Sequence, residues 1–553
     1  MTTMFEETFS DVWQAIARVS PARTALVTPS GHRWTFERFA REAAGLGAHL
    51  HERGLRSGDR VGIVLHNRPE FLITMFACLA HGFTPVPMNF RYRNVELAEL
   101  LTDSGPRALV FARSYRAVID DALAISGGTV ELVEVVDDVD RGADGRMPAP
   151  YAAEWDHAVG TPGTLPDRAP ADGEMWIYTG GTTARPKAVR WRVADMFRSK
   201  LFSIYDMNGL AQPTSLAQAV AVTEHYQRPQ LVNLPLAPFM HGTALSLAIN
   251  ALTVGGQVVV TAAASFDADA AVRLALRFGA TQIVVAGDAV AIPFADAAER
   301  LGVRLPLVTS IVSSGMRFSA GTKRRLHVLG RLAIQDIIAS SEGGGFAVTV
   351  TNSADELPGR ARLYPDAAVL DADGRPVHDV VGARGMLARS GTIPLGYFRD
   401  EEKTAATFPD IDGVRYVMPG DWVTVEEDRH VEFLGRGNAV INTGGEKVYP
   451  DEVEEVLLSH AAVQDAVVVG VPDDRFGEIV AAMVVLRAGQ TPGDAHLATY
   501  VGDRIAAYKK PRAIVFRDAI TRGASGKIDL ARVRAELVDD LHHSERHSPP
   551  SAE

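Results

Sequence analysis

The chain has 553 residues, of which 46% are hydrophobic and 22% charged, an ordinary globular composition with enough length to bury a core. Its formal net charge of −12 argues against a nucleic-acid-binding protein, which usually carries a basic surface. The single cysteine, Cys78, excludes a disulfide framework within the chain. The segment "MTTMFEETFSDVW" lacks an apolar signal core, and no apolar run approaches the ~20 residues of a membrane span, so we expect a cytoplasmic protein.

The first half of the chain alternates between helical and strand patterns. Apolar residues at helical spacing follow Thr35, a candidate N-cap, and stop at Gly54. The buried-strand pattern "DRVGIVLHN", a helical pattern with Pro69 in its first turn and the short strand "FTPVPMN" come next. The same order returns in "AAVRLALRFGA", "TQIVVAG" and "RLPLVTSIVSSG". This alternation predicts an α/β fold with mainly parallel sheets covered by helices.

The second half contains a change of pattern that predicts a domain boundary. A stretch rich in Pro, Gly and Asp (141–174) predicts a long surface connection. After residue 438 come a helical segment that follows Pro450, the strands "VQDAVVVGV" and "EIVAAMVVLRAG", and the helical "AHLATYVGDRIAAY". We therefore predict an N-terminal domain at 1–437, a small α+β C-terminal domain at 438–540 and a flexible polar tail at 541–553.

The stretch "YTGGTTARPKAVRW" (178–191) combines the groups that bind phosphate oxygens. Gly180 and Gly181 let backbone N–H groups approach a ligand, Thr182 and Thr183 add hydroxyls, and Lys187 adds a cation. The stretch is not a P-loop, because a proline and an alanine stand where that motif needs its second glycine and its Ser or Thr. Alone, such a stretch is more often a plain turn, so other parts of the chain are needed to show whether it binds phosphate.

Six further segments of the chain favour phosphate binding over a plain turn. They are "LPLAPFMHGTA" (234–244), "SSGMRFS" (313–319), "IQDIIASSEGGG" (334–345), "RYVMPGDWV" (415–423), "LGRGNAVINTGGEKVYPDEVEEVL" (434–457) and "TRGASGKIDLARVR" (521–534). In this order they resemble the adenylate-forming superfamily of acyl-CoA synthetases, luciferases and peptide-synthetase adenylation domains. The resemblance covers nearly the whole chain. The variants "TGGTT", "IPLGYFRDEEKTAATF" and "INTGGEKVYPDEVEE" look most like bacterial fatty-acyl and steroid-side-chain CoA ligases.

The resemblance implies a site for ATP and Mg²⁺. The ATP-binding residues that it implies are Thr179, Gly180, Gly181, Thr182, Thr183, Lys187, Ser314, Gly315, Met316, Asp336, Asp421 and Arg436. Ser341 would touch the α-phosphate, and Glu342 with Thr183 would hold Mg²⁺, which prefers oxygen ligands and commonly takes one or two carboxylates plus phosphates.

The resemblance also implies two half-reactions with coenzyme A as the second substrate. The substrate carboxylate would attack the α-phosphorus of ATP, with Lys527 stabilising the developing charge. The C-terminal domain, mobile in this family, would then rotate about Asn438 and bring in Gly444, Gly445 and Glu446 beside the pantetheine thiol. The implied acyl pocket contains Phe239, His241, Gly242, Ile338 and Ala339, with His241 near the substrate carboxylate.

Plain structural readings stand beside each of these roles. Taken alone, Asp421 in "PGDW" is better read as a turn aspartate and His241 as a core histidine, and Lys527 is equally one solvated lysine among others. The three histidines of the tail, His542, His543 and His547, are better read as part of a solvated end than as a metal site. Only the joint order of the motifs favours the functional reading.

The sequence departs from the usual family text at five places. Gly180 replaces a serine, Ala184 and Ala188 replace glycines, Ile338-Ala339 replaces Tyr-Gly, and Asn438 replaces the common Asp or Lys of the pivot. The added methyl groups should stiffen the phosphate loop. Loss of the tyrosine removes an aromatic wall from the adenine or acyl side, which hints at room for a bulky acid.

We therefore expect an AMP-forming carboxylic acid–CoA ligase for a hydrophobic acid. An amide synthetase, in which an amine captures the acyl-adenylate, is the first alternative, and a catalytically weak binding or scaffold protein is the second. The expected partners are small molecules, with a homodimer left open, and neither the acid nor the acceptor is fixed by the sequence.

Overall fold

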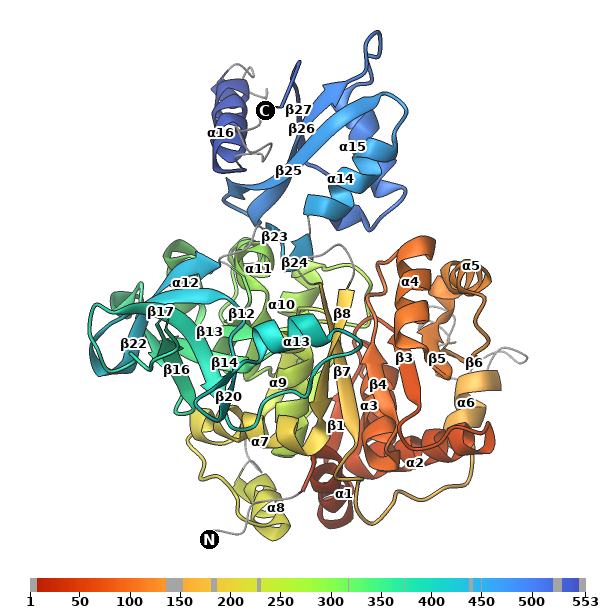
Figure 1. The fold of residues 1–553 in the computed structure, drawn as a ribbon. Helices are drawn as coiled ribbons and strands as arrows, with labels where there is room; N and C mark the ends of the chain where they lie inside the picture. Colours follow the sequence, from red (N-terminus) through yellow and green to blue (C-terminus); the bar gives the residue numbers. More distant parts are fainter. Residues whose placement is uncertain are drawn as a thin grey trace.

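The computed structural model describes residues 7–135, 153–180, 186–225, 230–316, 318–371, 373–436, 441–448, 450–520 and 530–546. A smaller C-terminal body sits on a large N-terminal body (Figure 1). The short strands β23 (Ile441–Thr443) and β24 (Glu446–Val448) lie at their junction. The predicted α/β class, with a large N-terminal part and a small α+β C-terminal part, is confirmed.

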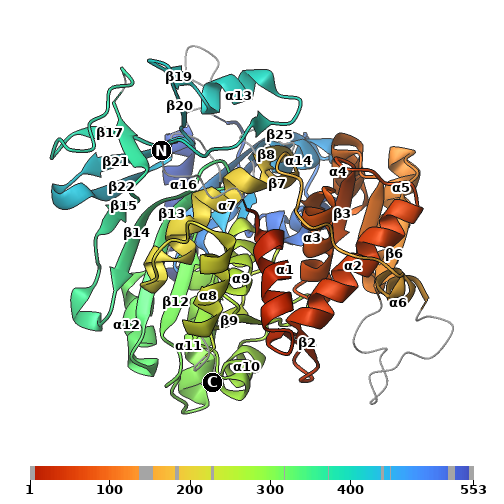
Figure 2. The ribbon, with the colours of Figure 1, turned by 90° about the horizontal axis from the view of Figure 1, so that it is seen from below.

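A four-stranded parallel sheet occupies one side of the large body. Its order is β4-β3-β5-β6, with β3 (Arg60–Val64), β4 (Thr84–Pro87), β5 (Ala108–Ala112) and β6 (Glu131–Val135). The helices of this region are α1 (Phe9–Val19), α2 (Phe36–Glu52), α3 (Pro69–His81), α4 (Asn94–Ser104), α5 (Arg116–Ser126) and α6 (Ala153–Gly160). Helices α1, α2 and α3 pack side by side (Figure 2). Helix α6 lies inside the stretch for which only a connection was predicted.

The helix boundaries of this region follow local sequence signals. The Thr35 hydroxyl accepts a hydrogen bond from the backbone N–H of Arg38 at 3.1 Å, which makes Thr35 the N-cap of α2 as predicted. Pro69 opens α3, where its missing N–H is not needed, and Gly82 ends that helix at φ 76°. Local chemistry therefore accounts for the start of both helices.

A 15-stranded mixed sheet forms the centre of the large body. Its order is β19-β20-β17-β21-β22-β15-β14-β13-β12-β11-β9-β10-β1-β2, with β16 paired to β17. Strands β13, β12, β11, β9, β10 and β1 run parallel, whereas the pairs from β14 to β22 are antiparallel. The alternating pattern predicted the parallel half. Most strands of the antiparallel half follow one another without an α-helix between them, and this half was not predicted.

The bounds of these strands are β1 (Thr24–Val27), β2 (Arg33–Thr35), β9 (Val232–Pro235), β10 (Gln257–Val259), β11 (Gln282–Val285), β12 (Ser310–Ser314), β13 (Ala333–Ser340), β14 (Gly344–Thr351), β15 (Ala361–Leu363), β16 (Ala367–Leu370), β17 (Arg384–Ser390), β19 (Asp410–Ile411), β20 (Val414–Val417), β21 (Asp421–Val425) and β22 (His430–Arg436). The helices around them are α7 (Val193–Ile204), α8 (Leu216–His225), α9 (Gly242–Thr253), α10 (Ala268–Phe278), α11 (Gly287–Arg300), α12 (Ala320–Leu329) and α13 (Glu401–Thr407). A third sheet, β18-β8-β7, contains β7 (Glu174–Gly180), β8 (Pro186–Arg192) and β18 (Gly396–Tyr397).

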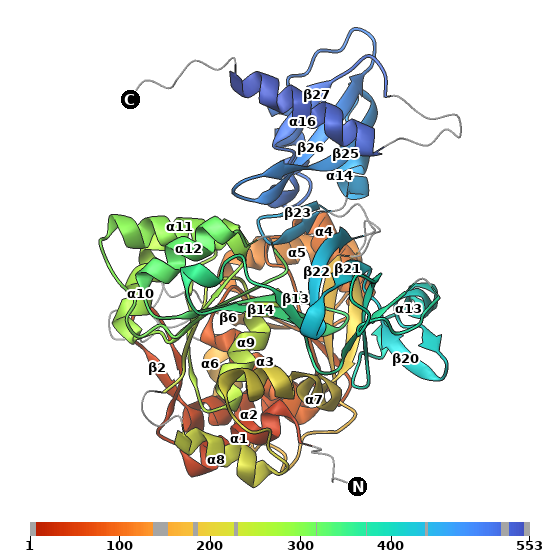
Figure 3. The same ribbon diagram turned by 90° about the vertical axis from the view of Figure 1, so that its left-hand side faces the viewer.

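The C-terminal body is a five-stranded sheet with helices. It contains β23, β24, β25 (Val463–Asp473), β26 (Gly477–Leu486) and β27 (Ala513–Phe516), with α14 (Pro450–Ser459), α15 (Asp494–Gly502) and α16 (Leu530–Arg546). Helix α16 lies across the sheet (Figure 3) and packs Val533, Leu537 and Leu541 against its strands. That packing explains why residues 541–546 continue the helix, where the sequence predicted a flexible tail.

Apolar burial accounts for the core of both bodies. Cys78 has no exposed surface, as its apolar surroundings predict, and burial raises the pKa of its thiol well above the ordinary value. Among the helices that the structure describes, none combines the length and the apolar composition that a bilayer crossing requires.

Helix α2 approaches α6 closely because Gly45 has no side chain. A Cβ atom at Gly45 would lie 2.2 Å from the carbonyl oxygen of Val159. Gly160, at the end of α6, does not adopt positive φ, and a Cβ atom added there would meet no neighbouring atom within 4 Å.

We predict that Gly45→Ala lowers the free energy of unfolding by about 1–3 kcal/mol, because a backbone carbonyl cannot move aside without shifting α6. Gly160→Ala is the matched control and should stay within about 0.5 kcal/mol of wild type. Chemical denaturation measures both. Equal stability of the two variants would contradict the close packing.

Candidate active site

Two cavities meet between the large body and the β23–β24 hairpin. The first, of about 260 Å³, is lined by α7, α9, β7, the end of β13 and the hairpin. The second, of about 1280 Å³, is lined by β12, β13, β21, β22 and parts of the C-terminal body. They share Gly315, Met316, Ile337, Ala339 and Lys447. The carboxyl ends of β12 and β13 open into both cavities, which is where open α/β sheets commonly bind ligands.

The predicted phosphate-binding stretch is a β7–β8 hairpin whose stems flank the first cavity. Thr179, 6% exposed, directs its hydroxyl at the Glu342 carboxylate, with Oγ1 3.5 Å from Oε1. Thr179 and Lys187 are opposite each other in the strand register, and Gly180 ends β7. The Lys187 ammonium forms an ion pair with Asp400, which also caps α13 through the backbone N–H of Lys403 at 2.9 Å. The stretch is thereby tied to α13.

Glu342 is a buried carboxylate, 8% exposed, beside the first cavity. The Tyr397 hydroxyl donates a hydrogen bond to its Oε1 at 2.9 Å. Burial lowers the pKa of the nearby Lys403, and the charge of Glu342 works against that shift. Trp191 fixes the adjoining turn by donating from Nε1 to the backbone carbonyl of Ser341 at 3.1 Å.

The donor set around Glu342 fits Mg²⁺. A carboxylate and the Thr179 hydroxyl provide hard oxygen ligands, and Mg²⁺ commonly takes one or two carboxylates and completes its shell with phosphates and water. In the described part of the chain no cluster of three or more His, Cys, Asp or Glu could hold a metal by itself.

The second cavity gathers several of the residues predicted for adenosine. Asp336 projects from β13 and forms an ion pair with Lys323, 2.8 Å from Nζ to Oδ2. Burial raises the pKa of Asp336, although Lys323 opposes the shift. Asp421, 2% exposed, begins β21 and is opposite Arg436 of β22 in the register. Ser314 lines the first cavity at the end of β12, followed by Gly315 and Met316, which line both.

A charged cluster joins the two bodies at the first cavity. His241 precedes α9, and its Nε2 lies 3.1 Å from Oε1 of Glu446 in the hairpin. Arg91 of the large body forms an ion pair with the same carboxylate. Burial opposes ionisation of Glu446, but His241, Arg91 and Lys509 together lower its pKa. The carboxylate is therefore charged at neutral pH.

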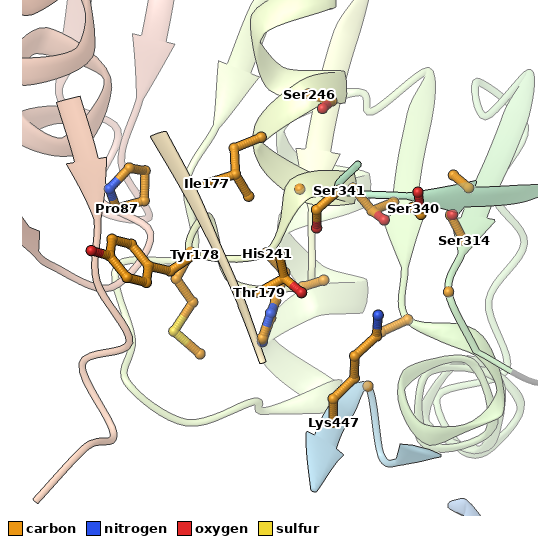
Figure 4. Close-up of a pocket in the computed structure, with 18 of the residues that line it drawn as sticks. Pro87, Ile177, Tyr178, Thr179, His241, Ser246, Ser314, Ser340, Ser341 and Lys447 are labelled. Carbon is orange, nitrogen blue, oxygen red and sulfur yellow. The ribbon is translucent and has the colours of Figure 1, made fainter. Parts of the chain in front are cut away.

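The hairpin turn faces the large body. Gly444 and Gly445 have φ of 58° and 92°, as a two-residue hairpin loop requires. A Cβ at Gly445 would lie 3.0 Å from Sδ of Met316, whereas one at Gly444 would meet Phe476 of its own body at 3.1 Å. Lys447 extends from the hairpin into the first cavity, and Ser246 lies at the cavity's opposite end (Figure 4).

The residues predicted for the acyl pocket divide among three locations. His241, Gly242 and Ala339 line the first cavity, and Ala339 also lines the second. Ile338 lines the second cavity alone, whereas its neighbours Ile337 and Ala339 line both cavities. Phe239 is 1% exposed and packs against Phe71 at 5.3 Å between ring centroids, so it belongs to the core.

Several predicted residues cannot be compared with the structure. Gly181, Thr182, Thr183, Asn438 and Lys527 lie outside the described residues, as does Ala184. Arg436 is described by its backbone alone.

Sequence reasoning missed other residues at the site. Asp400 and Tyr397, within "YFRDEEK", contact Lys187 and Glu342, and Lys509 lies at the domain junction. Lys200 and Lys447 line the first cavity. No local pattern marks these side chains, because each gains its role from a neighbour far away in the sequence.

Comparisons with known proteins agree with this architecture. The family model described as "AMP-binding enzyme" matches residues 13–398, and "AMP-binding enzyme C-terminal domain" matches residues 452–527. A medium/long-chain-fatty-acid–CoA/3-oxocholest-4-en-26-oate–CoA ligase of Mycobacterium tuberculosis is 37% identical over 535 residues, covering 94% of this chain and 95% of that protein. A 3-oxocholest-4-en-26-oate–CoA ligase of Rhodococcus rhodochrous is 37% identical over 524 residues, covering 92% of each.

Among solved structures, the amide bond synthetase McbA from Marinactinospora thermotolerans superposes with a TM-score of 0.77 at 24% identity. The match covers 96% of this chain and 99% of that one, and it shows a shared fold. With both family models matched in order along the sequence, the chain belongs to the family of AMP-binding enzymes.

Proposed function

We propose that the chain is an AMP-forming acid–CoA ligase, which activates a hydrophobic carboxylic acid with ATP and then transfers the acyl group to coenzyme A. The observation that carries this proposal is the meeting of two cavities beneath the β23–β24 hairpin, one suited to an acid and one to a nucleotide. The activities of the 37% identical relatives, which are CoA ligases for fatty and steroid acids, support the same reaction.

In this proposal the second cavity holds the adenosine of ATP. Lys323 occupies Oδ2 of Asp336, so Oδ1 is the acceptor that remains for the exocyclic amine of adenine. Asp421 and Arg436, which are opposite each other in the register of β21 and β22, would bind the ribose hydroxyls, since a carboxylate accepts two such bonds well. Ser314, Gly315 and Met316 border the base.

The phosphates would then extend toward the β7–β8 hairpin. Thr179 through Thr183 would donate to their oxygens, and Lys187 would exchange Asp400 for a phosphate oxygen. Mg²⁺ bound at Glu342 would neutralise phosphate charge and so ease the approach of an anionic carboxylate. Ser341, held by Trp191, would bond to the α-phosphate.

The first half-reaction forms an acyl-adenylate. An oxygen of the substrate carboxylate bonds to the α-phosphorus, and the bond from that phosphorus to the bridging oxygen breaks and releases pyrophosphate. Positioning and charge neutralisation supply most of the catalysis in such transfers. Lys527 is proposed to stabilise the charge that develops between the two anions.

The second half-reaction uses the face of the C-terminal body that the hairpin presents. The pantetheine sulfur bonds to the acyl carbon, the acyl–phosphate bond breaks, AMP leaves and the thiol proton is lost. The backbone of Gly444 and Gly445 would let the thiol approach between the two bodies, and rotation about Asn438 would exchange this face for Lys527.

An acid library with ATP and Mg²⁺, with and without coenzyme A, tests the function by mass spectrometry of the products. The expected products are AMP, pyrophosphate and an acyl-CoA. An acyl-adenylate that does not react with coenzyme A but reacts with an added amine would instead favour an amide synthetase. A cytoplasmic location and a homodimer stay predictions from the sequence.

We predict that Lys527→Ala slows formation of the acyl-adenylate by on the order of 10²-fold or more, the scale of a lost charge-stabilising donor. The variant should still make thioester from supplied acyl-adenylate. Rapid-quench assays of each half-reaction measure both rates, with the exposed Lys510→Ala as control. If Lys527→Ala formed the acyl-adenylate at the wild-type rate, Lys527 would not stabilise charge in the first half-reaction.

We predict that Glu342→Gln raises the Mg²⁺ concentration needed for ATP–pyrophosphate exchange by at least about tenfold, the lower range for disturbing a metal site. The amide keeps an oxygen acceptor for Tyr397 but loses the charge. Tyr397→Phe is the control, since it removes the hydrogen bond and leaves the carboxylate. A larger effect from Tyr397→Phe would mean that Glu342 acts only through structure.

We predict that Gly445→Ala slows thioester formation more than adenylation, because its methyl group would press on Met316 and Ala286 of the large body. Gly444→Ala provides a matched control, since it strains the same turn at positive φ, while its methyl group would press on Phe476 of its own body and only touch Ala289 of the large body at 4.0 Å. Single-turnover kinetics of each half-reaction separates them. Equal loss of both half-reactions in both variants would show that the turn conformation alone matters.

A further inference from the structure

The end of the first cavity farthest from the hairpin is polar, although its walls are largely apolar. Helix α9 places Gly242, Ser246 and Asn250 on one face, four residues apart, and all three line the cavity. Helix α7 adds Lys200 and Ser203 from its own inward face. Between this end and the hairpin the wall includes Ile177, Met196, Leu247 and Tyr364. An acid lying here would have an apolar middle and a polar far end.

The polar end is a cluster of four side chains that form two hydrogen-bonded pairs, Lys200 with Ser246 and Asn250 with Ser203. The Lys200 ammonium donates to Oγ of Ser246 at 2.9 Å, and Nδ2 of Asn250 donates to Oγ of Ser203 at 3.2 Å. Asn250 is only 7% exposed, and its Oδ1 is buried without a hydrogen-bond partner. A buried polar atom with no hydrogen-bond partner calls for an explanation.

Lys200 also lacks a counter-charge. Among the residues that the structure describes, no carboxylate forms an ion pair with Lys200, and the nearby Arg389 is already paired with Asp366. Burial, followed by the positive charge of Arg389, lowers the pKa of Lys200 to about 8. The cavity end therefore holds a cation with donors beyond the one that Ser246 accepts, and an amide oxygen that no hydrogen bond uses.

We propose that this cluster is a subsite for an oxygen at the far end of the acid, so that the preferred substrate carries a carbonyl or second carboxylate remote from the carboxyl group that is activated. The inference rests on the proposed function and names the class of acid that the enzyme would activate. The oxygen accepts a hydrogen bond from Lys200. The amide of Asn250 can be turned by 180°, so that Oδ1 accepts from the Ser203 hydroxyl and Nδ2 donates to the same ligand oxygen.

The helix geometry sets the spacing of the two ends. From Gly242, beside His241 and the junction with the hairpin, Ser246 and Asn250 lie about 6 Å and 12 Å along the axis of α9, at 1.5 Å per residue. Figure 4 shows Ser246 at the end of the cavity away from Lys447. A simple alkyl tail that reached this depth would offer no hydrogen bond to the remaining donors of Lys200 or to Oδ1 of Asn250, and would keep water from them, which is unfavourable.

The test compares three acids of one length with the full-length enzyme: decanoic acid, its keto analogue with the carbonyl on the penultimate carbon, and decanedioic acid. For the wild type, kcat/KM for at least one oxygenated acid should exceed that for decanoic acid by about tenfold or more, because sites built for hydrogen bonds reject analogues that lack them. The keto acid and the diacid together distinguish a neutral from an anionic end group.

Lys200→Met should invert this preference, raising kcat/KM for decanoic acid and lowering it at least about tenfold for the oxygenated acid. Lys200→Arg should keep part of the wild-type preference, and the exposed Lys510→Met should keep all of it. Inversion cannot come from misfolding, which would depress both substrates together. A wild type without preference, or a Lys200→Met variant with the wild-type ratio, overturns the subsite. Absence of pyrophosphate exchange with every acid would instead overturn the proposed function.

Discussion

Buried ion pairs between the two bodies determine the arrangement of the whole site. Glu446, 5% exposed, lies between His241 and Arg91, and Lys509 donates to Glu96 at 2.8 Å and to Glu452 at 2.6 Å. Arg91, His241 and Glu96 belong to the large body, and the others belong to the C-terminal body. Because these pairs dock the hairpin, they fix where Lys447 enters the first cavity and where the two cavities meet.

An interface held by ion pairs between the two bodies differs in net stability from one held by apolar contacts. The attraction within a buried ion pair is largely offset by the loss of hydration of both groups, whereas removing one partner leaves the other buried and uncompensated. Such an interface specifies one geometry without adding much net stability. Under the proposed function the C-terminal body presents two faces in turn, and an interface of matched charges suits a contact that forms and separates in every cycle.

Local signals made part of this structure predictable. Thr35 and Pro69 set the starts of α2 and α3 through capping and the fixed φ of proline, and the motif order brought His241 and Ser341 to one cavity. The partners of these residues were not predictable. Lys187 and Asp400 are 213 positions apart, and Lys509 and Glu96 are 413 apart, so only the folded topology gives them a shared role.

The separation of the cavities also changes the meaning of Ile338. From the sequence, isoleucine in place of the family tyrosine suggested more room for a bulky acid. The structure places Ile338 on the wall of the second cavity, while the first is shaped by α7, α9 and Tyr364. Helices α7 and α9 carry no residue of the proposed nucleotide site beyond their first turns. Substitutions deeper in these helices can therefore alter the choice of acid while the chemistry at the junction stays the same. Lys200 is one of these deeper residues.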